Sequence, residues 1–298
     1  MNDAIEPTWI AVDWGTTHLR AWAMSGGHDV LATAQSCDGM GKLARDGFEP
    51  ALRAVVAPWQ VTNDTPVVAC GMVGSRQGWV EAPYASVPCP ALSPALAKPA
   101  SPLNVRVIPG IKQESPADVM RGEETQIAGF LALNPNWDGV ICLPGTHTKW
   151  VHVSANEVVS FQTAMTGDLF AAISGHTVLR HSIDDGWDDD GFADALNASL
   201  SRPERLAASL FAIRAEGLLN GLTNASARAR LSGLLIGAEL AAAKPYWLGQ
   251  QVAVIGEGGL SRLYVDALMA QSVAATQVNA DRVTLAGLTA AYRAWKDI

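Results

Sequence analysis

The sequence contains little cysteine and no spacing that would mark a metal site or a disulfide framework. Its four cysteines lie far apart, and none belongs to a C-x-x-C pair. Structural zinc sites usually contain closely spaced cysteines and disulfide-rich domains contain many, so the sequence suggests neither class. The six histidines show no metal-ligand spacing either. We expect a protein of a reducing compartment.

An excess of positive charge and a membrane-length apolar run are also missing. The formal net charge is −8, whereas proteins that bind nucleic-acid backbones normally carry a basic surface, so we expect no nucleic-acid partner. No stretch reaches 18 consecutive apolar residues, and Met1 to Glu6 lack the basic and apolar regions of a signal peptide. We therefore expect a cytoplasmic protein with no membrane partner.

The chain is long and apolar enough for two globular domains, with 298 residues of which 49% are hydrophobic. Short apolar segments bounded by Gly and Pro alternate with longer segments of helical periodicity, which predicts an α/β fold. The predicted strands are Trp9–Val12, Val67–Cys70, Val105–Ile108, Val140–Leu143, Trp150–Val153 and Val252–Ile255. The predicted helices are Gly47–Ala57, Glu123–Leu133, Leu169–Leu179, Arg205–Leu219, Leu231–Ala243, Ser261–Ala270 and Leu285–Trp295.

A break at Asn134 to Asn136 falls near the middle of the chain. We predict an N-terminal domain over residues 1–134 and a C-terminal domain over 135–298, whose last helix returns to the region between them. Two further segments, Ala82–Pro102 and Asp184–Asp190, are predicted to be excursions from the core and not low-complexity tails. The second holds five aspartates, but their spacing is not that of an EF-hand, so we predict a solvated loop.

Two segments predict β-hairpins whose turns suit a phosphate. In Ile10–Met24 an apolar strand ends at Asp13, and a second strand follows the turn of Gly15, Thr16 and Thr17. Such small residues let backbone N–H groups approach a phosphate, and Asp13 at the strand end suits Mg²⁺ held through water. An ordinary hairpin with a glycine-containing turn is the alternative for this segment alone.

The second hairpin lies in Val140–Val153. Lys149 adds a cation beside its turn, although a lysine there is more often solvated and a lone histidine more often structural. A third segment, Val252–Leu268, places three glycines between an apolar strand and a helix, where a planar ligand could approach the backbone, but it lacks the G-x-G-x-x-G spacing of a Rossmann loop. The turn residues of the second hairpin are Gly145, Thr146, His147 and Thr148, and the three glycines are Gly256, Gly258 and Gly259.

Paired strand–turn–strand loops, one in each half, resemble those with which the actin, Hsp70 and sugar kinase superfamily holds a nucleotide. Four segments narrow the resemblance to 2-dehydro-3-deoxygalactonokinases, and it covers essentially the whole chain. These segments are Cys70–Tyr84, Leu143–Val151, Phe161–Leu179 and Val254–Tyr264. The resemblance implies a two-domain actin-like (ribonuclease H-like) α/β fold with an interdomain nucleotide cleft.

The resemblance also implies the reaction and its cofactors. ATP with Mg²⁺ would phosphorylate the terminal 6-hydroxyl of 2-dehydro-3-deoxy-D-galactonate in galactonate and galactose catabolism, and the glycines of Val252–Leu268 fall where the superfamily binds adenosine. The second hairpin lacks the aspartate found in actin and Hsp70, so Asp13 is the leading carboxylate for the metal. Glu123 and Glu124 lie where the superfamily's sugar kinases carry their catalytic carboxylate. Glutamates in a first helical turn also simply complement the helix dipole.

Asp168 is a second candidate for the base, although helix capping alone explains an aspartate after Thr166 and Gly167. For the substrate, a keto-deoxy acid needs a cation and fixed polar groups. Arg76 could pair with its carboxylate, and Ser75, Gln77 and Trp79 could complete the pocket. The alternative is a surface loop with a solvated arginine and a packing tryptophan.

Two other functions remain open at this stage. A kinase for another sugar or keto-deoxy acid would use the same fold, because a motif does not encode the configuration of a hydroxyl. A nucleotide-regulated, actin-like binding protein would hydrolyse ATP slowly without a small-molecule acceptor. We expect the partners to be ATP and a small sugar acid, and the sequence leaves the oligomeric state open.

Overall fold

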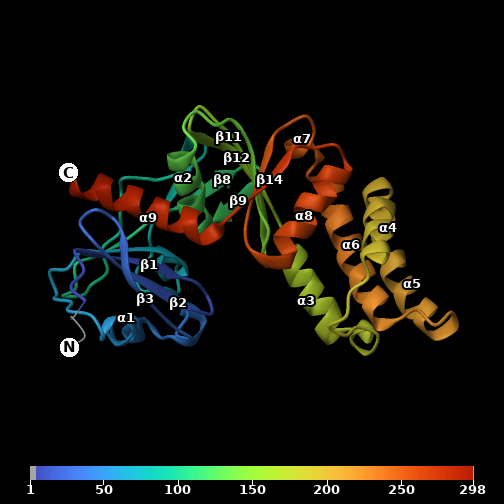
Figure 1. Ribbon diagram of the computed structural model, residues 1–298, viewed down its shortest axis with the longest axis horizontal. Coiled ribbons are helices and arrows are strands. Elements are labelled where there is room, and N and C mark those ends of the chain that lie inside the picture. Colours follow the sequence, from blue (N-terminus) through green and yellow to red (C-terminus); the bar gives the residue numbers. More distant parts are fainter. Residues whose placement is uncertain (1–4, 298) are drawn as a thin grey trace. The chain divides into compact units, whose positions relative to one another are not determined.

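The computed structural model describes residues 5–297, and Figure 1 shows the course of the chain. These residues form two compact units. The first contains the chain up to Asp138, Val153–Ser160 and the segment from Asn279, and the second contains Gly139–His152 and Phe161–Val278. This division differs from the two consecutive stretches that the sequence suggests, because the chain returns to the first unit twice.

The first unit is built on a five-stranded sheet that packs against a buried hydrophobic cluster on each face, with its edge strand β3 (Val30–Ser36) largely exposed. The strands, in sheet order, are β3, β2 (Leu19–Met24), β1 (Trp9–Trp14), β4 (Val67–Gly71) and β7 (Val105–Val107). The helices are α1 (Phe48–Val56), α2 (Glu123–Leu133) and α9 (Ala280–Lys296). Side chains alternate along β1, so that Ile10 and Val12 pack in a cluster with α1, whereas Trp9 and Ala11 pack in a cluster with α9.

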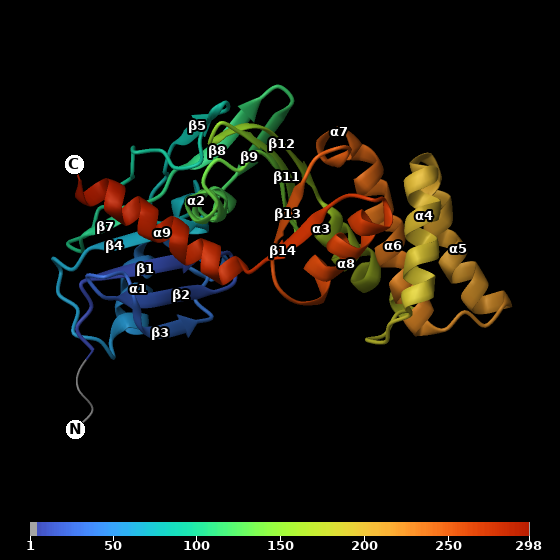
Figure 2. The ribbon, with the colours of Figure 1, turned by 45° about the horizontal axis from the view of Figure 1, so that its top comes forward.

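Figure 2 shows α9 beside α2, over β1 and β4. The close approach of the two helices depends on glycine. A Cβ added at Gly129 would lie 1.8 Å from the Val283 carbonyl oxygen, and one at Gly287 would lie 1.9 Å from the Thr125 carbonyl oxygen. No other residue fits these positions, and the packing explains why the last helix belongs to the first unit.

The same unit holds a smaller sheet that leads into α2. Its strands, in sheet order, are β5 (Tyr84–Ser86), β8 (Gly110–Glu114) and β9 (Ala117–Met120). The short strand β6 (Cys89–Pro90) pairs with Glu157 and Val158. Only Arg121 and Gly122 separate β9 from α2, so the small sheet fixes the start of that helix.

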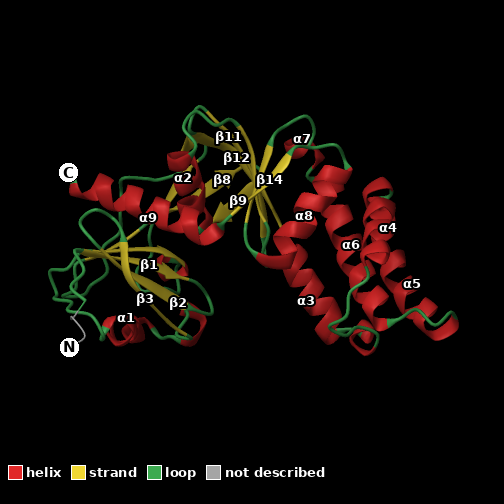
Figure 3. Cartoon of the chain, viewed as in Figure 1, coloured by secondary structure: helices red, strands yellow, loops and turns green. Residues whose placement is uncertain are grey.

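The second unit combines a sheet with a group of helices. The strands, in sheet order, are β14 (Ala275–Val278), β13 (Val252–Ile255), β10 (Gly139–Leu143), β11 (Thr148–Ser154), β12 (Glu157–Ala164) and β6. Residues 153–160 of β11 and β12, with β6, belong to the first unit. The helices are α3 (Thr166–His176), α4 (Asp189–Ser201), α5 (Leu206–Leu219), α6 (Asn224–Ala242), α7 (Lys244–Trp247) and α8 (Gly258–Ala270). Figure 3 shows α4, α5 and α6 side by side. Short 3₁₀ turns lie at Met40–Lys42, Arg45–Gly47, Met72–Gly74, Val178–His181 and Pro203–Arg205.

The structure contains every predicted strand and helix, with shifted ends, and the α/β prediction is confirmed. The prediction of a loop over Asp184–Asp190 is wrong at its end, because Asp189 and Asp190 form the first turn of α4. Asp188 is the N-cap, and its side chain accepts a hydrogen bond from the backbone N–H of Gly191. The acidic run therefore begins a helix and complements its dipole.

Two negative findings apply to the part of the chain that the structure describes. Within residues 5–297, no group of three or more His, Cys, Asp or Glu side chains is arranged to hold a metal ion. Over the same residues, none of the helices has the length and apolar character needed to cross a membrane.

Candidate active site

The first predicted phosphate turn is a tight hairpin turn that is held by backbone hydrogen bonds from residues 39–41. The Gly15 N–H donates to the His18 carbonyl at 3.0 Å, and Thr16 and Thr17 are exposed. The carbonyl groups of residues 15–17 accept backbone N–H groups from Gly39, Met40 and Gly41. A Cβ at Gly39 would lie only 2.2 Å from the Thr17 carbonyl carbon, so a glycine that sequence reasoning missed fixes the turn.

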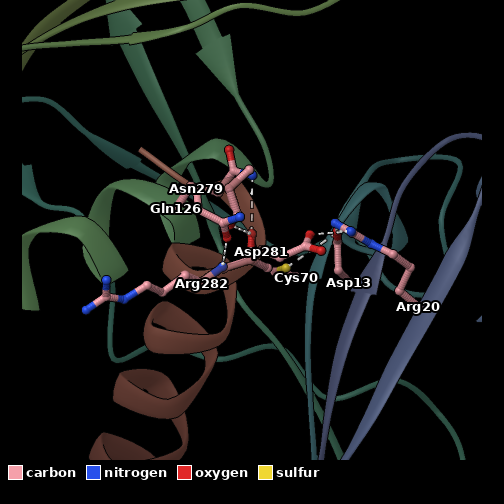
Figure 4. Close-up of polar contacts among 9 residues, drawn as sticks. Asp13, Arg20, Cys70, Gln126, Asn279, Asp281 and Arg282 are labelled. Carbon is pink, nitrogen blue, oxygen red and sulfur yellow. Dashed lines mark hydrogen bonds and ion pairs between the residues drawn. The ribbon is translucent and has the colours of Figure 1, made fainter. Parts of the chain in front are cut away.

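Asp13 has a charged partner beside this turn (Figure 4). Its Oδ2 accepts a hydrogen bond from Arg20 Nη2 at 2.6 Å, and Arg20 Nη1 lies 2.5 Å from Asp281 Oδ1 at the start of α9. Burial alone would lower the pKa of Arg20, but its hydrogen bonds and charge interactions with the two carboxylates raise that pKa. Asp13 and Arg20 are directly opposite each other in the pairing of β1 with β2. The predicted hairpin could have indicated this ion pair, but sequence reasoning missed it.

Cys70 connects Asp13 to the start of α2. Its thiol lies 3.8 Å from Asp13 Oδ1 and also forms a hydrogen bond with Thr125. Burial, followed by the charges of Asp13 and Glu124, holds the pKa of the thiol well above its usual range. The proposed metal carboxylate and the proposed base therefore belong to one contiguous region of the first unit.

The two glutamates of this region differ in accessibility. Glu124 is fully buried, and its carboxylate accepts hydrogen bonds from the Gly122 N–H at 2.6 Å and Thr125 Oγ1 at 3.0 Å. Burial, with the charge of Glu123, raises the pKa of Glu124 to about 8. Glu123 is half-buried, and its Oε2 accepts the Arg121 N–H at 3.1 Å. Of the two glutamates at the predicted position of the catalytic carboxylate, only Glu123 is partly exposed.

The predicted substrate loop has two exposed and two buried members. The side chains of Arg76 and Gln77 are exposed, and the Arg76 carbonyl accepts a hydrogen bond from Arg45 Nη2 at 2.9 Å. Ser75 is buried, and its Oγ has no partner among the described residues. Trp79 is buried in the first core, where its ring stacks on Phe48 at 6.3 Å, so it supports the loop from beneath.

Arg121 is a polar residue near this loop that sequence reasoning missed. Its guanidinium lies 4.3 Å from the centre of the Tyr84 ring, and Nη2 donates to the Ala82 carbonyl at 2.8 Å. Its Nε and Nη1 are buried without a hydrogen-bond partner within residues 5–297. A Cβ at Gly74 would lie 2.8 Å from Nη1, which places Arg121 directly against the loop.

The second unit brings the second hairpin and Asp168 together. The Asp168 N–H donates to the Thr146 carbonyl at 3.0 Å, and its carboxylate lies 2.9 Å from His147 Nε2. A Cβ at Gly167 would lie 2.4 Å from the Gly145 carbonyl oxygen, so glycine is required for this contact. Asp168 thus lies beside the second hairpin, whereas Glu123 and Glu124 belong to the first unit.

The turn residues of the second hairpin have different environments. Thr146 and His147 are exposed, whereas Thr148 and Lys149 are buried. Thr148 Oγ1 lies 3.1 Å from Tyr264 Oη on α8. The hairpin therefore offers its first residues to a ligand and uses Thr148 to contact a neighbouring helix.

A cavity of about 820 Å³ lies beside this hairpin in the second unit. Its lining residues include Gly145, Gly167 and Gly259. Of the remaining predicted glycines, Gly258 has a left-handed φ of +71°, and a Cβ at Gly256 would lie 2.1 Å from Ser261 Oγ. The second hairpin and the glycine-rich start of α8 thus contribute to one site. Aromatic and apolar walls come from Phe170, Trp187, Phe192, Leu260 and Leu263.

Known proteins of similar sequence share this architecture. The profile of the family described as 2-keto-3-deoxy-galactonokinase matches residues 13–291. A 2-dehydro-3-deoxygalactonokinase of Escherichia coli is 37% identical over 94% of this chain and 96% of its own. A probable 2-dehydro-3-deoxygalactonokinase of Rhizobium meliloti is 40% identical over 95% of this chain and 96% of its own.

A solved structure extends the similarity to three dimensions. The crystal structure of a candidate 2-dehydro-3-deoxygalactonokinase from Sinorhizobium meliloti superposes with a TM-score of 0.91, at 38% identity, over 96% of this chain and 98% of its own. The predicted actin-like sugar kinase fold is confirmed. The chain belongs to the 2-keto-3-deoxy-galactonokinase family.

Proposed function

We propose that this protein transfers the γ-phosphoryl group of ATP to the 6-hydroxyl of 2-dehydro-3-deoxy-D-galactonate and releases ADP. Membership of the family supports a kinase that acts on a keto-deoxy sugar acid. The single structural observation that carries the proposal is the cavity of about 820 Å³, because two sequence-predicted nucleotide motifs line it together. Its volume lies within the usual range for small-molecule sites.

The adenosine of ATP would occupy this cavity. Apolar side chains such as Phe170 and Leu260 line it and suit a planar base. The glycine-rich start of α8 presents backbone N–H groups without side chains, and the exposed Thr146 and His147 lie at the adjacent hairpin. A helix N-terminus and a small-residue turn both favour the negative charge of phosphates.

Mg²⁺ would be held at Asp13, which fits this role. The ion prefers oxygen ligands and keeps several waters, and the Asp13 side chain is 23% exposed at the end of β1. When bound, the ion would supply positive charge that offsets the negative charge developing on the phosphates during transfer. Arg20 holds the Asp13 carboxylate in place at 2.6 Å.

Glu123 is the proposed general base for the 6-hydroxyl. A base must be unprotonated and reachable by the acceptor. Glu124 fits neither condition at neutral pH, because it is fully buried and its pKa is about 8. Asp168 is the alternative, since it is 44% exposed at the second hairpin. The loop of Ser75, Arg76 and Gln77 would bind the acid.

Phosphorylation assays test the reaction directly. ADP release should require the acid, and 2-dehydro-3-deoxygalactonate should have the highest kcat/KM among 2-keto-3-deoxy acids and their parent sugars. Higher kcat/KM for another acid would support a kinase of different specificity. ATP hydrolysis that does not change when any acid is added would instead support a nucleotide-regulated binding protein.

A further inference from the structure

A buried carboxylate, Glu239, lies behind the cavity and has no place in the reaction described above. It belongs to α6, and its side chain is only 6% exposed. Burial raises its pKa, and three side-chain hydrogen bonds oppose that effect. A buried carboxylate is costly unless such donors surround it, so its surroundings indicate a specific role.

Three donors from three different elements converge on Glu239. Trp150 Nε1, on β11, donates to Oε1 at 2.7 Å. Tyr264 Oη, on α8, donates to Oε2 at 2.8 Å, and Thr166 Oγ1, the first residue of α3, donates to the same oxygen. Thr148 Oγ1 extends the network, because it lies 3.1 Å from Tyr264 Oη.

Each donor belongs to a part of the proposed nucleotide site. Thr148 ends the turn of the second hairpin, and Trp150 follows two residues later on the same strand. Thr166 precedes Gly167, which contacts the hairpin backbone, and both residues line the cavity. Tyr264 also lines the cavity and lies on the helix that begins at the predicted adenosine glycines.

We propose that Glu239 is a positioning residue for the nucleotide, which fixes the second hairpin, the start of α3 and α8 relative to one another. This inference rests on the proposed function. One carboxylate that accepts hydrogen bonds from all three elements sets their spacing. Because the site is already ordered, the nucleotide binds without the loss of conformational entropy that ordering these elements would cost. Glu239 itself need not touch the nucleotide.

Isothermal titration calorimetry with ADP tests the inference in the full chain. Glu239→Gln keeps the size of the side chain but presents an amide to the donors, and it should weaken ADP binding at least about tenfold. Thr166→Val removes one donor and should weaken binding, whereas Thr166→Ser keeps the hydroxyl and should restore it to within about twofold of wild type. Glu216→Gln is the matched control, because Glu216 pairs with Arg230 of α6 away from the cavity.

Steady-state kinetics separate positioning from a general loss of folded protein. For Glu239→Gln and Thr166→Val, if they fold, the KM for ATP should rise while the KM for the sugar acid stays within about twofold of wild type; for Thr166→Ser and Glu216→Gln both KM values should stay near wild type. If Glu239→Gln does not fold, the two Thr166 variants decide. If Glu239→Gln binds ADP as tightly as wild type, or if Thr166→Val and Thr166→Ser bind ADP equally, this inference is overturned while the proposed function still stands. A wild-type protein that does not bind ADP would overturn the proposed function and this inference with it.

Discussion

Replacing the fully buried Glu124 by Gln should change how folding stability depends on pH. Burial, followed by the charge of Glu123, raises the pKa of Glu124 from 4.5 to about 8. An acid with a higher pKa in the folded than in the unfolded state contributes its full stabilisation below the unfolded pKa, and loses it as the pH rises through the folded pKa. One pKa unit is worth about 1.4 kcal/mol, so the wild-type free energy of unfolding should fall by about 5 kcal/mol from this group between about pH 4 and pH 9.

Urea denaturation followed by circular dichroism at about pH 5, 7 and 9 measures this effect. Gln does not titrate, so the stability of Glu124→Gln relative to wild type should increase with pH across this window. Glu204→Gln changes an exposed glutamate and should follow the wild-type curve. A stability difference between Glu124→Gln and wild type that stays constant within about 1 kcal/mol from pH 5 to 9 would refute the assignment of a buried, protonated Glu124.

The remaining predictions concern catalysis. Glu123→Gln should lower kcat by about 10²- to 10⁴-fold, or about 3 to 5 kcal/mol of barrier, with ATP binding retained; a loss confined to Asp168→Asn would transfer the role of base to Asp168. Asp13→Asn should keep the fold and lower turnover by about 10²-fold at any Mg²⁺ concentration, because the carboxylate that holds the ion is lost; near wild-type activity would remove Asp13 from the site. Arg76→Ala should raise the KM for the acid about tenfold and leave the KM for ATP unchanged, whereas equal changes in both would mean that the loop only supports the fold.

The sequence could predict features that depend on local patterns. The two hairpins and the glycine-rich start of α8 appear where apolar strands meet small residues, and the position of Glu123 and Glu124 at the first turn of α2 is correct. The helix at Asp189 was missed because acidic residues are typical of both solvated loops and helix N-termini. The sequence left two roles open for Trp79, a pocket wall and a packing residue, and its burial against Phe48 depends on a contact with a distant part of the chain.

Features that depend on long-range packing could not be predicted in this way. Glu239 meets Trp150 and Thr166 from 89 and 73 residues away, and nothing in its own helix distinguishes it from a solvated glutamate. The different accessibilities of Glu123 and Glu124 likewise depend on the elements packed around α2. The pairing of Asp13 with Arg20 lies between these two cases. It joins two strands, but the register of the local hairpin is enough to place Arg20 opposite Asp13.

ATP-dependent phosphorylation of purified 2-dehydro-3-deoxygalactonate tests the central claim most directly. Mass spectrometry of the product should show one added phosphoryl group at the 6-hydroxyl, formed in equal amounts with ADP and only when the protein, ATP and the acid are all present. Production of ADP without a phosphorylated acid, at the same rate with and without the acid, would contradict the account.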